Sequence, residues 1–147
     1  MIALLQRVSA AQVRVDAETL GTIDRGLLVF LAIERLDTEL DAQGLAERVL
    51  GYRVFEDSRG RMHLSVRDLQ ASVLGVPQFT LAADTAQGLR PSFTPAAPPE
   101  LGKTLYDCFV ENLKSQCDLS IATGRFGANM QVELVNDGPV TFWLQTK

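Results

Sequence analysis

The single histidine of the chain could form at most part of a nucleophilic site. His63 stands two positions before Ser65, so the two side chains would share one face of a strand, where an imidazole can take the proton of a serine hydroxyl. The alternative is an exposed histidine next to a turn at residues 57–60. We favour this second interpretation, in which His63 has no catalytic role.

Two cysteines are the other candidate nucleophiles. Cys108 adjoins Phe109 on the apolar side of a predicted helix, a position typical of a core residue. Cys117 lies near the end of that helix, and the chain has no second histidine to activate it. Two cysteines do not make the dense disulfide framework of a small secreted protein, so we expect both as reduced thiols.

Metal and nucleotide motifs are missing from the sequence. It has neither an H-E-x-x-H helix nor paired C-x-x-C ligands, the usual spacings of zinc sites. Neither the P-loop pattern nor G-x-G-x-x-G leads from a predicted strand into a helix. We therefore expect no bound metal and no cofactor.

The length and composition predict a single domain over residues 1–147. Hydrophobic residues make up 46% and charged residues 22% of the chain, which is ordinary globular composition. No segment approaches the roughly 20 apolar residues that span a bilayer, and no cleavable leader precedes the first predicted strand. A cytoplasmic protein without a membrane partner is the expectation.

The charge balance argues against a protein that coats nucleic acid by charge alone. The net charge is −4, and three of the 14 basic residues are lysines, which leaves 11 arginines. Arginine suits a few directed, bidentate contacts to phosphate better than a diffuse basic field.

The elements that would position these residues follow from the apolar patterns. Apolar runs predict strands at residues 2–8, 12–15 and 26–33, the last buried on both faces. Helical spacing after Ile33 predicts a first helix, capped by Asp37 or Thr38, and residues 52–66 are typical of a hairpin. A strand at 72–81 is interrupted by Pro77, which must occupy an edge, a bulge or a strand end.

The second half of the chain adds one helix and two strands. Pro98 and Pro99 precede a helix whose apolar residues recur every four positions, which predicts that its apolar stripe packs on the sheet. Strands at 129–135 and 140–145 are joined by residues 136–139. The elements do not alternate as βαβ units would, so we predict a mainly antiparallel α+β domain with two helices.

Two segments of the sequence resemble the signatures of one enzyme family. Residues 72–85 (SVLGVPQFTLAADT) are similar to the first signature of the D-aminoacyl-tRNA deacylases, whose core reads Ser-Gln-Phe-Thr-Leu; four of the five core positions match. Residues 134–143 (LVNDGPVTFW) match every defined position of the second signature, Asn-x-Gly-Pro-x-Thr. Shorter likenesses extend over the whole chain, including residues 6–8, 47–53, 88–93 and 123–126.

The resemblance implies a homodimer built on a partly barrel-like sheet. In that family the Gly-Pro pair of one subunit, in a cis peptide, enters the pocket of the other. The carbonyl oxygens of Gly138 and Pro139 would then probe the α-carbon of the amino acid and exclude L side chains, with Arg7 holding the segment in place. Asn136 and Thr141 belong to the same motif, and Phe126 is a further expected substrate contact.

The resemblance also implies catalysis without a catalytic triad. Gln78, Phe79 and Thr80 would bind the aminoacyl ester at the 3′ end of tRNA, and backbone amides near Phe79 and Thr80 would stabilise the oxyanion. The 2′-hydroxyl of the terminal ribose would help to activate water. Thr80 is a conceivable nucleophile, but the sequence shows no base for it, and we favour an orienting role.

One departure from the signature leaves alternatives open. Pro77 stands where the family usually has serine, which removes a hydroxyl and an amide donor. Deacylases with Pro-Gln at this point also act on L-alanyl-tRNA, so a relaxed enzyme is the second hypothesis. The third is a nucleic-acid-binding dimer without turnover, because relatives have been linked to DNA replication. The leading expectation remains hydrolysis of D-aminoacyl-tRNA, and of glycine mischarged on tRNA.

Overall fold

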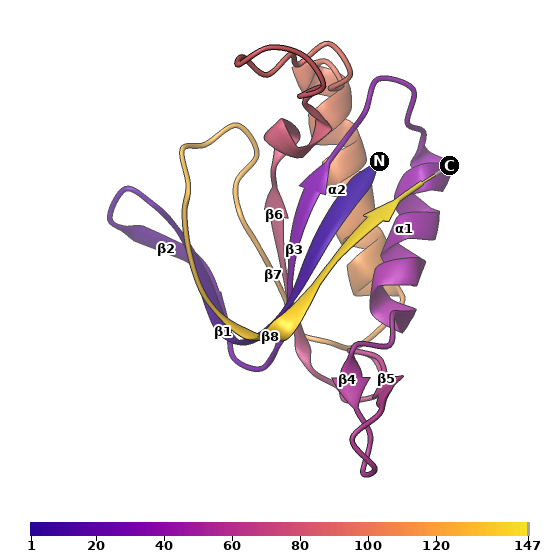
Figure 1. Ribbon diagram of the computed structural model, residues 1–147. Helices are drawn as coiled ribbons and strands as arrows, with labels where there is room; N and C mark the ends of the chain where they lie inside the picture. The colour runs from indigo at the N-terminus through magenta and orange to yellow at the C-terminus, as the bar shows by residue number, and fades with distance from the viewer. Residues whose placement is uncertain (147) are drawn as a thin grey trace.

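The computed structural model describes residues 1–146, in which two helices cover one face of a curved, six-stranded sheet (Figure 1). The strand order is β2-β1-β3-β6-β7, and β8 pairs with β1. These strands are β1 (Ile2–Val15), β2 (Glu18–Ile23), β3 (Gly26–Ala32), β6 (Ser72–Pro77), β7 (Ile121–Thr123) and β8 (Gln131–Gln145). The other elements are helices α1 (Glu39–Gly51) and α2 (Pro99–Ser115), the short pair β4 (Phe55–Glu56) and β5 (Met62–Leu64), and a 3₁₀ turn, η1 (Phe79–Ala82).

The first two predicted strands are one element in the structure. β1 runs without a break through residues 2–15 and pairs antiparallel with β2, β3 and β8. The separate strands predicted at 2–8 and 12–15 were therefore wrong, and β2 was missed. Ser9, Ala10 and Ala11 lie between the two predicted strands and do not interrupt β1; Ser9 and Ala10 are exposed at a register shift against β8.

The sheet is more mixed than predicted. β6 pairs parallel with β3, and β7 pairs parallel with β6, so the antiparallel half is confined to β1, β2, β3 and β8. A Cβ atom on Gly21 of β2 would lie 3.0 Å from the Cβ of Ala122 in β7. This close approach of the two edge strands nearly closes the sheet into the expected barrel-like form.

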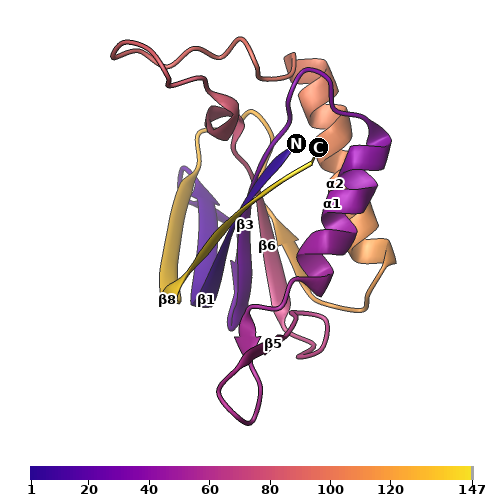
Figure 2. The same cartoon turned by 45° about the vertical axis from the view of Figure 1, so that its right-hand side comes forward.

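Both helices form where the sequence predicts them. Thr38 caps α1 in a capping box with Asp41, and Pro99 occupies the first turn of α2. Figure 2 shows the two helices together on one side of the sheet. Their apolar faces meet the sheet in the main core, which includes Leu45, Phe109 and Leu113, all at most 1% exposed. The predicted stripe of α2 is confirmed, although Leu101 at its start is only partly buried.

The tail forms one strand, β8, where the sequence predicts two strands at 129–135 and 140–145. Residues 131–136 and 141–145 both pair with β1, and the register passes from Gln6 opposite Thr141 to Val8 opposite Asn136. Over this step β8 therefore has three more residues than β1. Asp137, Gly138 and Pro139 form an exposed excursion from a continuous strand, and not a turn between two strands.

Candidate active site

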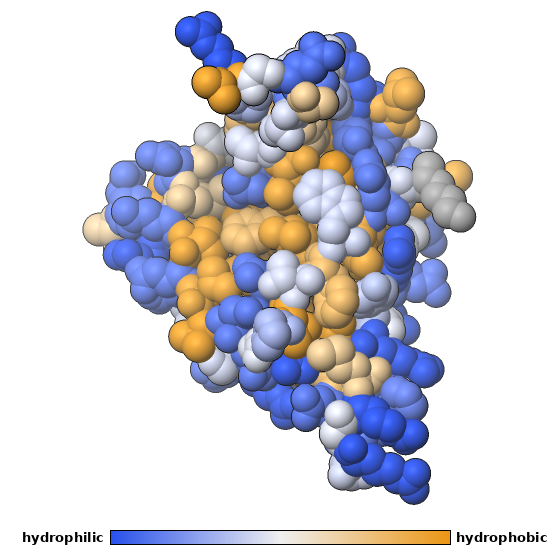
Figure 3. Space-filling model, in the orientation of Figure 1, coloured by the Kyte–Doolittle hydropathy of each residue, from blue (hydrophilic) through white to orange (hydrophobic). Residues whose placement is uncertain are grey.

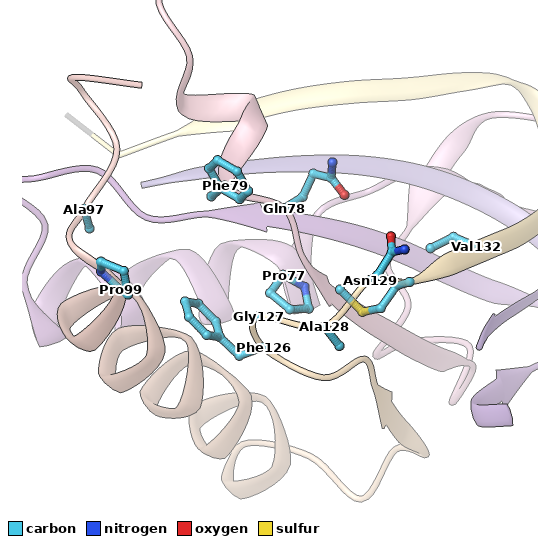
Figure 4. Close-up of a pocket in the computed structure, with 11 residues that line it drawn as sticks. Pro77, Gln78, Phe79, Ala97, Pro99, Phe126, Gly127, Ala128, Asn129 and Val132 are labelled. Carbon is cyan, nitrogen blue, oxygen red and sulfur yellow. The ribbon is translucent and has the colours of Figure 1, made fainter. Parts of the chain in front are cut away.

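A pocket opens where β6 ends. Pro77 is the last residue of that strand, so the predicted strand end is confirmed, but the strand predicted over residues 72–81 is too long because residues 79–82 form η1. The pocket has a volume of about 460 Å³, within the range of small-molecule sites. Its lining is mostly apolar and comes from three segments (Figure 4): Pro77, Gln78, Phe79, Ala97, Pro99, Phe126, Gly127, Ala128, Asn129, Met130 and Val132.

The first signature forms one wall and the rim of this pocket. The amide of Gln78 donates to the carbonyl of Leu31 at 2.8 Å, and the chain then turns into η1. The side-chain amide of Gln78 donates to Oγ1 of Thr80 at 2.7 Å. Thr80 therefore accepts one hydrogen bond and keeps its own hydroxyl proton free to donate. Phe79 is 58% exposed and rests on Phe93, with 5.1 Å between ring centroids.

Two backbone amides at the rim are free. Helix starts leave their first N–H groups without partners inside the helix, and η1 has no side-chain cap. Within residues 1–146, the amides of Phe79 and Thr80 have no hydrogen-bond acceptor outside η1, whereas those of Gln78, Leu81 and Ala83 are bonded. The signature thus presents two adjacent donors beside the pocket.

Packing beneath the rim fixes the position of β6. The hydroxyl of the buried Tyr106 donates to the carbonyl of Gly75 at 3.0 Å, and the amide of Gly124 donates to the same oxygen at 2.9 Å. Burial raises the pKa of Tyr106 far above its ordinary value, so the hydroxyl remains a donor. Pro77 therefore lies two residues after a carbonyl, that of Gly75, which is hydrogen-bonded both by α2 and by the chain after β7.

The opposite wall was only partly predicted. Phe126, an expected contact, does line the pocket and lies over α2, where a Cβ atom on Gly102 would come within 3.1 Å of its ring. Asn129 and Met130 were missed. They follow a glycine-containing loop with no periodic pattern. Only their closeness to Phe126 in the sequence could have indicated them.

The second signature lies elsewhere in the subunit. The Gly138–Pro139 peptide bond is cis, as the resemblance implied. Neither residue is among those that line the pocket of its own subunit, and their strand, β8, pairs with β1 and not with β6, the strand that leads into η1. The same subunit therefore does not bring the two signatures together.

Arg7 holds this excursion from the inside. Its side chain is 8% exposed; Nε donates to the carbonyl of Asp137 at 2.9 Å, and a terminal nitrogen donates to the carbonyl of Val54 at 2.7 Å. Nε also lies 3.2 Å from the Asp137 carboxylate. A planar guanidinium suits two such acceptors at once, so Arg7 links the Gly-Pro segment to the chain that precedes β4.

The other motif residues brace the same excursion. The side-chain amide of Asn136 donates to the carbonyls of Arg7 and Val140, at 3.0 and 3.1 Å, and so spans the base of the excursion. Thr141 accepts from the side chain of Gln6 at 3.2 Å. Asn136 and Thr141 thus lie far from the pocket of their own subunit, with Gly138 and Pro139.

The other candidate nucleophiles are not assembled into a site. His63 faces Asp57, with 3.6 Å between Nδ1 and Oδ2, whereas the hydroxyl of Ser65 donates to Asp68 at 2.8 Å. The imagined Ser-His pair does not form. Cys108 packs at the edge of the main core, where burial raises the pKa of its thiol, and the thiol of Cys117 donates to the carbonyl of Leu113. Both cysteines are free.

Metal clusters and membrane-spanning helices are both missing from the described part of the chain. Within residues 1–146, no group of three or more His, Cys, Asp or Glu side chains is arranged to hold a metal ion. None of the helices there combines the length and the apolar character needed to cross a bilayer.

Comparisons with known proteins agree on one family. The family model described as D-Tyr-tRNA(Tyr) deacylase matches residues 4–145. A D-aminoacyl-tRNA deacylase of Thioalkalivibrio sulfidiphilus (strain HL-EbGR7) is 59% identical over 145 residues, 99% of this chain and 97% of that protein. One from Janthinobacterium sp. (strain Marseille) is 58% identical over 147 residues, 100% and 98% of the two chains.

Solved structures give the same fold. The c-Myc DNA unwinding element binding protein superposes with a TM-score of 0.95 at 40% identity, covering 100% of this chain and 99% of that one. A structure described as a probable eukaryotic D-amino acid tRNA deacylase superposes with a TM-score of 0.85 over 97% of each chain; at 17% identity it supports the fold alone. With a family match over residues 4–145 and full-length relatives at 58–59% identity, this chain belongs to the D-Tyr-tRNA(Tyr) deacylase family.

Proposed function

We propose that the protein hydrolyses the ester bond of D-aminoacyl-tRNA and releases free D-amino acid and tRNA. The observation that carries the proposal is the rim of the pocket, where Phe79 lines a cavity of about 460 Å³ and the amides of Phe79 and of the next residue, Thr80, are unpartnered. Loss of a single oxyanion donor typically slows hydrolysis about 100- to 1,000-fold. Two fixed amides can therefore supply much of the rate without a triad.

The reaction divides between the protein and its substrate. Water attacks the ester carbonyl, the oxyanion forms against the two amides, and the C–O bond to the ribose breaks as the ribose oxygen takes up a proton. The neighbouring 2′-hydroxyl, which both donates and accepts hydrogen bonds, assists the attacking water. Thr80 orients the ester with its free hydroxyl proton, since Gln78 occupies its oxygen as a donor.

Selection of the D-form is assigned to the Gly138–Pro139 segment of a second subunit. The segment is exposed and braced by Arg7 and Asn136, so it can act as a rigid wall that leaves no room for an L side chain. Glycine, which has no side chain, would pass the same wall. Glycine mischarged on tRNA is therefore a second expected substrate.

An uncovered apolar face supports the homodimer. Apolar side chains cross the face of the sheet that is turned away from the helices (Figure 3). Trp143 of β8 pairs with Leu4 of β1, and Leu4 pairs with Phe30 of β3; Trp143 is 50% exposed. Exposed apolar surface that extends over neighbouring strands is typical of an interface. This face includes the strand that carries the Gly-Pro segment.

Parallel deacylation assays test the proposal. D-tyrosyl-tRNA and glycyl-tRNA should lose their amino acid while L-tyrosyl-tRNA survives, in excess of the uncatalysed rate of each ester. Stable D-tyrosyl-tRNA at micromolar protein would disprove the assignment. Salt-dependent binding to duplex DNA without any hydrolysis would favour the DNA-binding alternative. The 40% identical relative is named as a DNA unwinding element binding protein.

Pro77 motivates the relaxed alternative. It lines the pocket directly and offers neither a hydroxyl nor an amide, so L-alanyl-tRNA could enter. Comparable rates on L-alanyl-tRNA and D-tyrosyl-tRNA would support this alternative. A Pro77→Ser variant with unchanged selectivity would remove its physical basis.

A further inference from the structure

A basic hairpin projects from the acidic molecule at the point where Arg7 holds the Gly-Pro segment. Residues 53–67, here called the arginine hairpin, contain β4 and β5 and extend away from the sheet and both termini (Figure 1). Four arginines and two acids give the arginine hairpin a net charge of +2. Because the whole chain has a net charge of −4, the residues outside the hairpin together carry −6. A segment of net positive charge thus lies at one end of an otherwise acidic molecule.

One of the two acids of the arginine hairpin, Asp57, holds its turn in place. Asp57 accepts from the backbone amides of Arg59 and Arg61, at 2.8 and 3.0 Å, and its other oxygen accepts both Nε and a terminal nitrogen of Arg61. These bonds hold the turn and lower the pKa of Asp57, so it remains a carboxylate at neutral pH. The bonds to Asp57 orient the side chain of Arg61, which is still 53% exposed.

Two of the other three arginines of the hairpin remain open to solvent, whereas Arg67 is half-buried. Arg53 and Arg59 are exposed, and within residues 1–146 the side chain of Arg59 forms no hydrogen bond or salt bridge. Five rigid N–H donors make arginine well suited to phosphate oxygens. The hairpin therefore presents a row of directed cations on a backbone that its own turn bonds fix.

Arg7 ties this hairpin to the segment that completes the site. It bonds the carbonyl of Val54 at the base of the hairpin and that of Asp137 beside Gly138. When Gly138 and Pro139 enter a neighbouring pocket, the base of the hairpin must lie at the mouth of that pocket. At about 3.3 Å per residue, Arg59 can then reach roughly 16 Å outward from the mouth.

The pocket accommodates only the end of a tRNA. A volume of about 460 Å³ takes a small molecule, so the nucleotides before the aminoacylated one must leave through the mouth. Their phosphates are the nearest polyanion to Arg53, Arg59 and Arg61. We propose that the arginine hairpin of one subunit binds the acceptor-end phosphates of the tRNA whose ester lies in the other subunit's pocket; this inference rests on the proposed function.

Charge-removal variants of the full-length dimer test the contact. An Arg53→Gln/Arg59→Gln variant should raise the KM for D-tyrosyl-tRNA about tenfold and reduce the slope of log KM against log salt by roughly 1 to 2. Its kcat should not change, and neither should hydrolysis of D-tyrosyl-adenosine, which has the ester but no acceptor stem. Lys103→Gln/Lys114→Gln removes the same charge from two exposed side chains of α2 and is the matched control.

Two results of this comparison would overturn the inference. One is an unchanged KM for D-tyrosyl-tRNA in the arginine variant. The other is an equal rise in KM in the lysine control, which would assign the effect to net charge. If the wild-type protein fails on D-tyrosyl-tRNA and on D-tyrosyl-adenosine alike, it is the proposed function that fails.

Heterodimers with one live pocket test which subunit supplies the hairpin. The pocket of one chain is inactivated by Gln78→Ala/Phe79→Ala, and the hairpin change is placed either in the partner or in this same chain. The live pocket should keep the wild-type KM when its own chain carries the hairpin change, and should show the tenfold rise when the inactivated chain carries it. The reverse pattern, or no difference, would contradict binding across the dimer.

Discussion

Thr80 is the residue at which two chemical roles can be separated. Its hydroxyl oxygen accepts from the side chain of Gln78 at 2.7 Å, and a carboxamide cannot act as a base for a nucleophile. Thr80→Ala should therefore lower kcat on D-tyrosyl-tRNA about tenfold or less, by loss of orientation, and Thr80→Ser should restore it. Single-turnover kinetics measure both. A loss above about 1,000-fold, together with a trapped acyl-threonine, would assign the nucleophile to Thr80.

Arg7 connects the Gly-Pro segment to the chain before β4 by bonds from one side chain to two carbonyls. Lysine has one ammonium group in place of the planar fork, so Arg7→Lys leaves the carbonyl of Val54 or of Asp137 without its donor. We expect the free energy of unfolding to fall by about 1–3 kcal/mol, and the ratio of D- to L-tyrosyl-tRNA hydrolysis to fall with it.

Urea unfolding and parallel deacylation assays measure these two effects. Arg125→Lys is the matched control, because Arg125 forms an exposed ion pair with Glu18 and such pairs contribute little. An Arg7→Lys protein with wild-type stability and selectivity would show that the Gly-Pro segment needs no support from Arg7.

The start of α1 offers a test at the level of one helix. The side chain of Thr38 accepts from the amide of Asp41, whose carboxylate accepts from Thr38 in return. Thr38→Ala should lower the free energy of unfolding by about 1 kcal/mol at pH 7. Thr104→Ala, in the middle of α2 and exposed, is the control and should cost little.

The same cap should depend on pH in a defined direction. The hydrogen bond from the Thr38 side chain, with that from its backbone, lowers the pKa of Asp41 in the folded protein. The stabilisation is therefore complete above the unfolded value near 4 and is lost as pH falls through the lower folded value. The difference between wild type and Thr38→Ala in urea should shrink between pH 5 and pH 2; a constant difference would contradict this account of the cap.

The elements differ in how much of them the sequence could predict. Both helices and the buried strand β3 follow from periodicity and caps, as Thr38 and Pro99 show. β7 has three residues, too few for any period, and the parallel pairing of β6 with β3 and β7 depends on distant partners that apolar patterns do not specify. β8 was divided at its glycine and proline, which mark an excursion as readily as a turn.

The candidate site divides in the same way. Gln78, Thr80, Gly138 and Pro139 could be named from their signatures; in the structure Gln78 is half-buried and bonded to Thr80, whereas Thr80, Gly138 and Pro139 are exposed. Asn129 and Met130 reach the pocket only through the fold, which brings their part of the chain next to Pro77. The separation of the two signatures within one subunit could not be read from the order of residues.

For the molecule as a whole, the acidic balance and an RNA substrate are compatible. A net charge of −4 would repel a polyanion from most of the surface, whereas the arginine hairpin gives the tRNA one cationic approach. Because this attraction is restricted to the hairpin, it favours a single orientation of the tRNA on the dimer. Binding of D-tyrosyl-tRNA should therefore weaken steeply with salt, although the protein is acidic.

We propose that the Gly138–Pro139 segment of one subunit selects among the esters held by the other, and a tagged heterodimer tests this selection. One chain carries Gln78→Ala/Phe79→Ala; its partner carries Gly138→Ala, where a Cβ atom would lie 2.7 Å from the amide nitrogen of Val140 and displace the segment. The live pocket then belongs to the chain with the displaced segment. We predict that this heterodimer still hydrolyses D-tyrosyl-tRNA and spares L-tyrosyl-tRNA, while the Gly138→Ala homodimer loses that discrimination. A heterodimer that hydrolyses both enantiomers would contradict selection by the partner's segment.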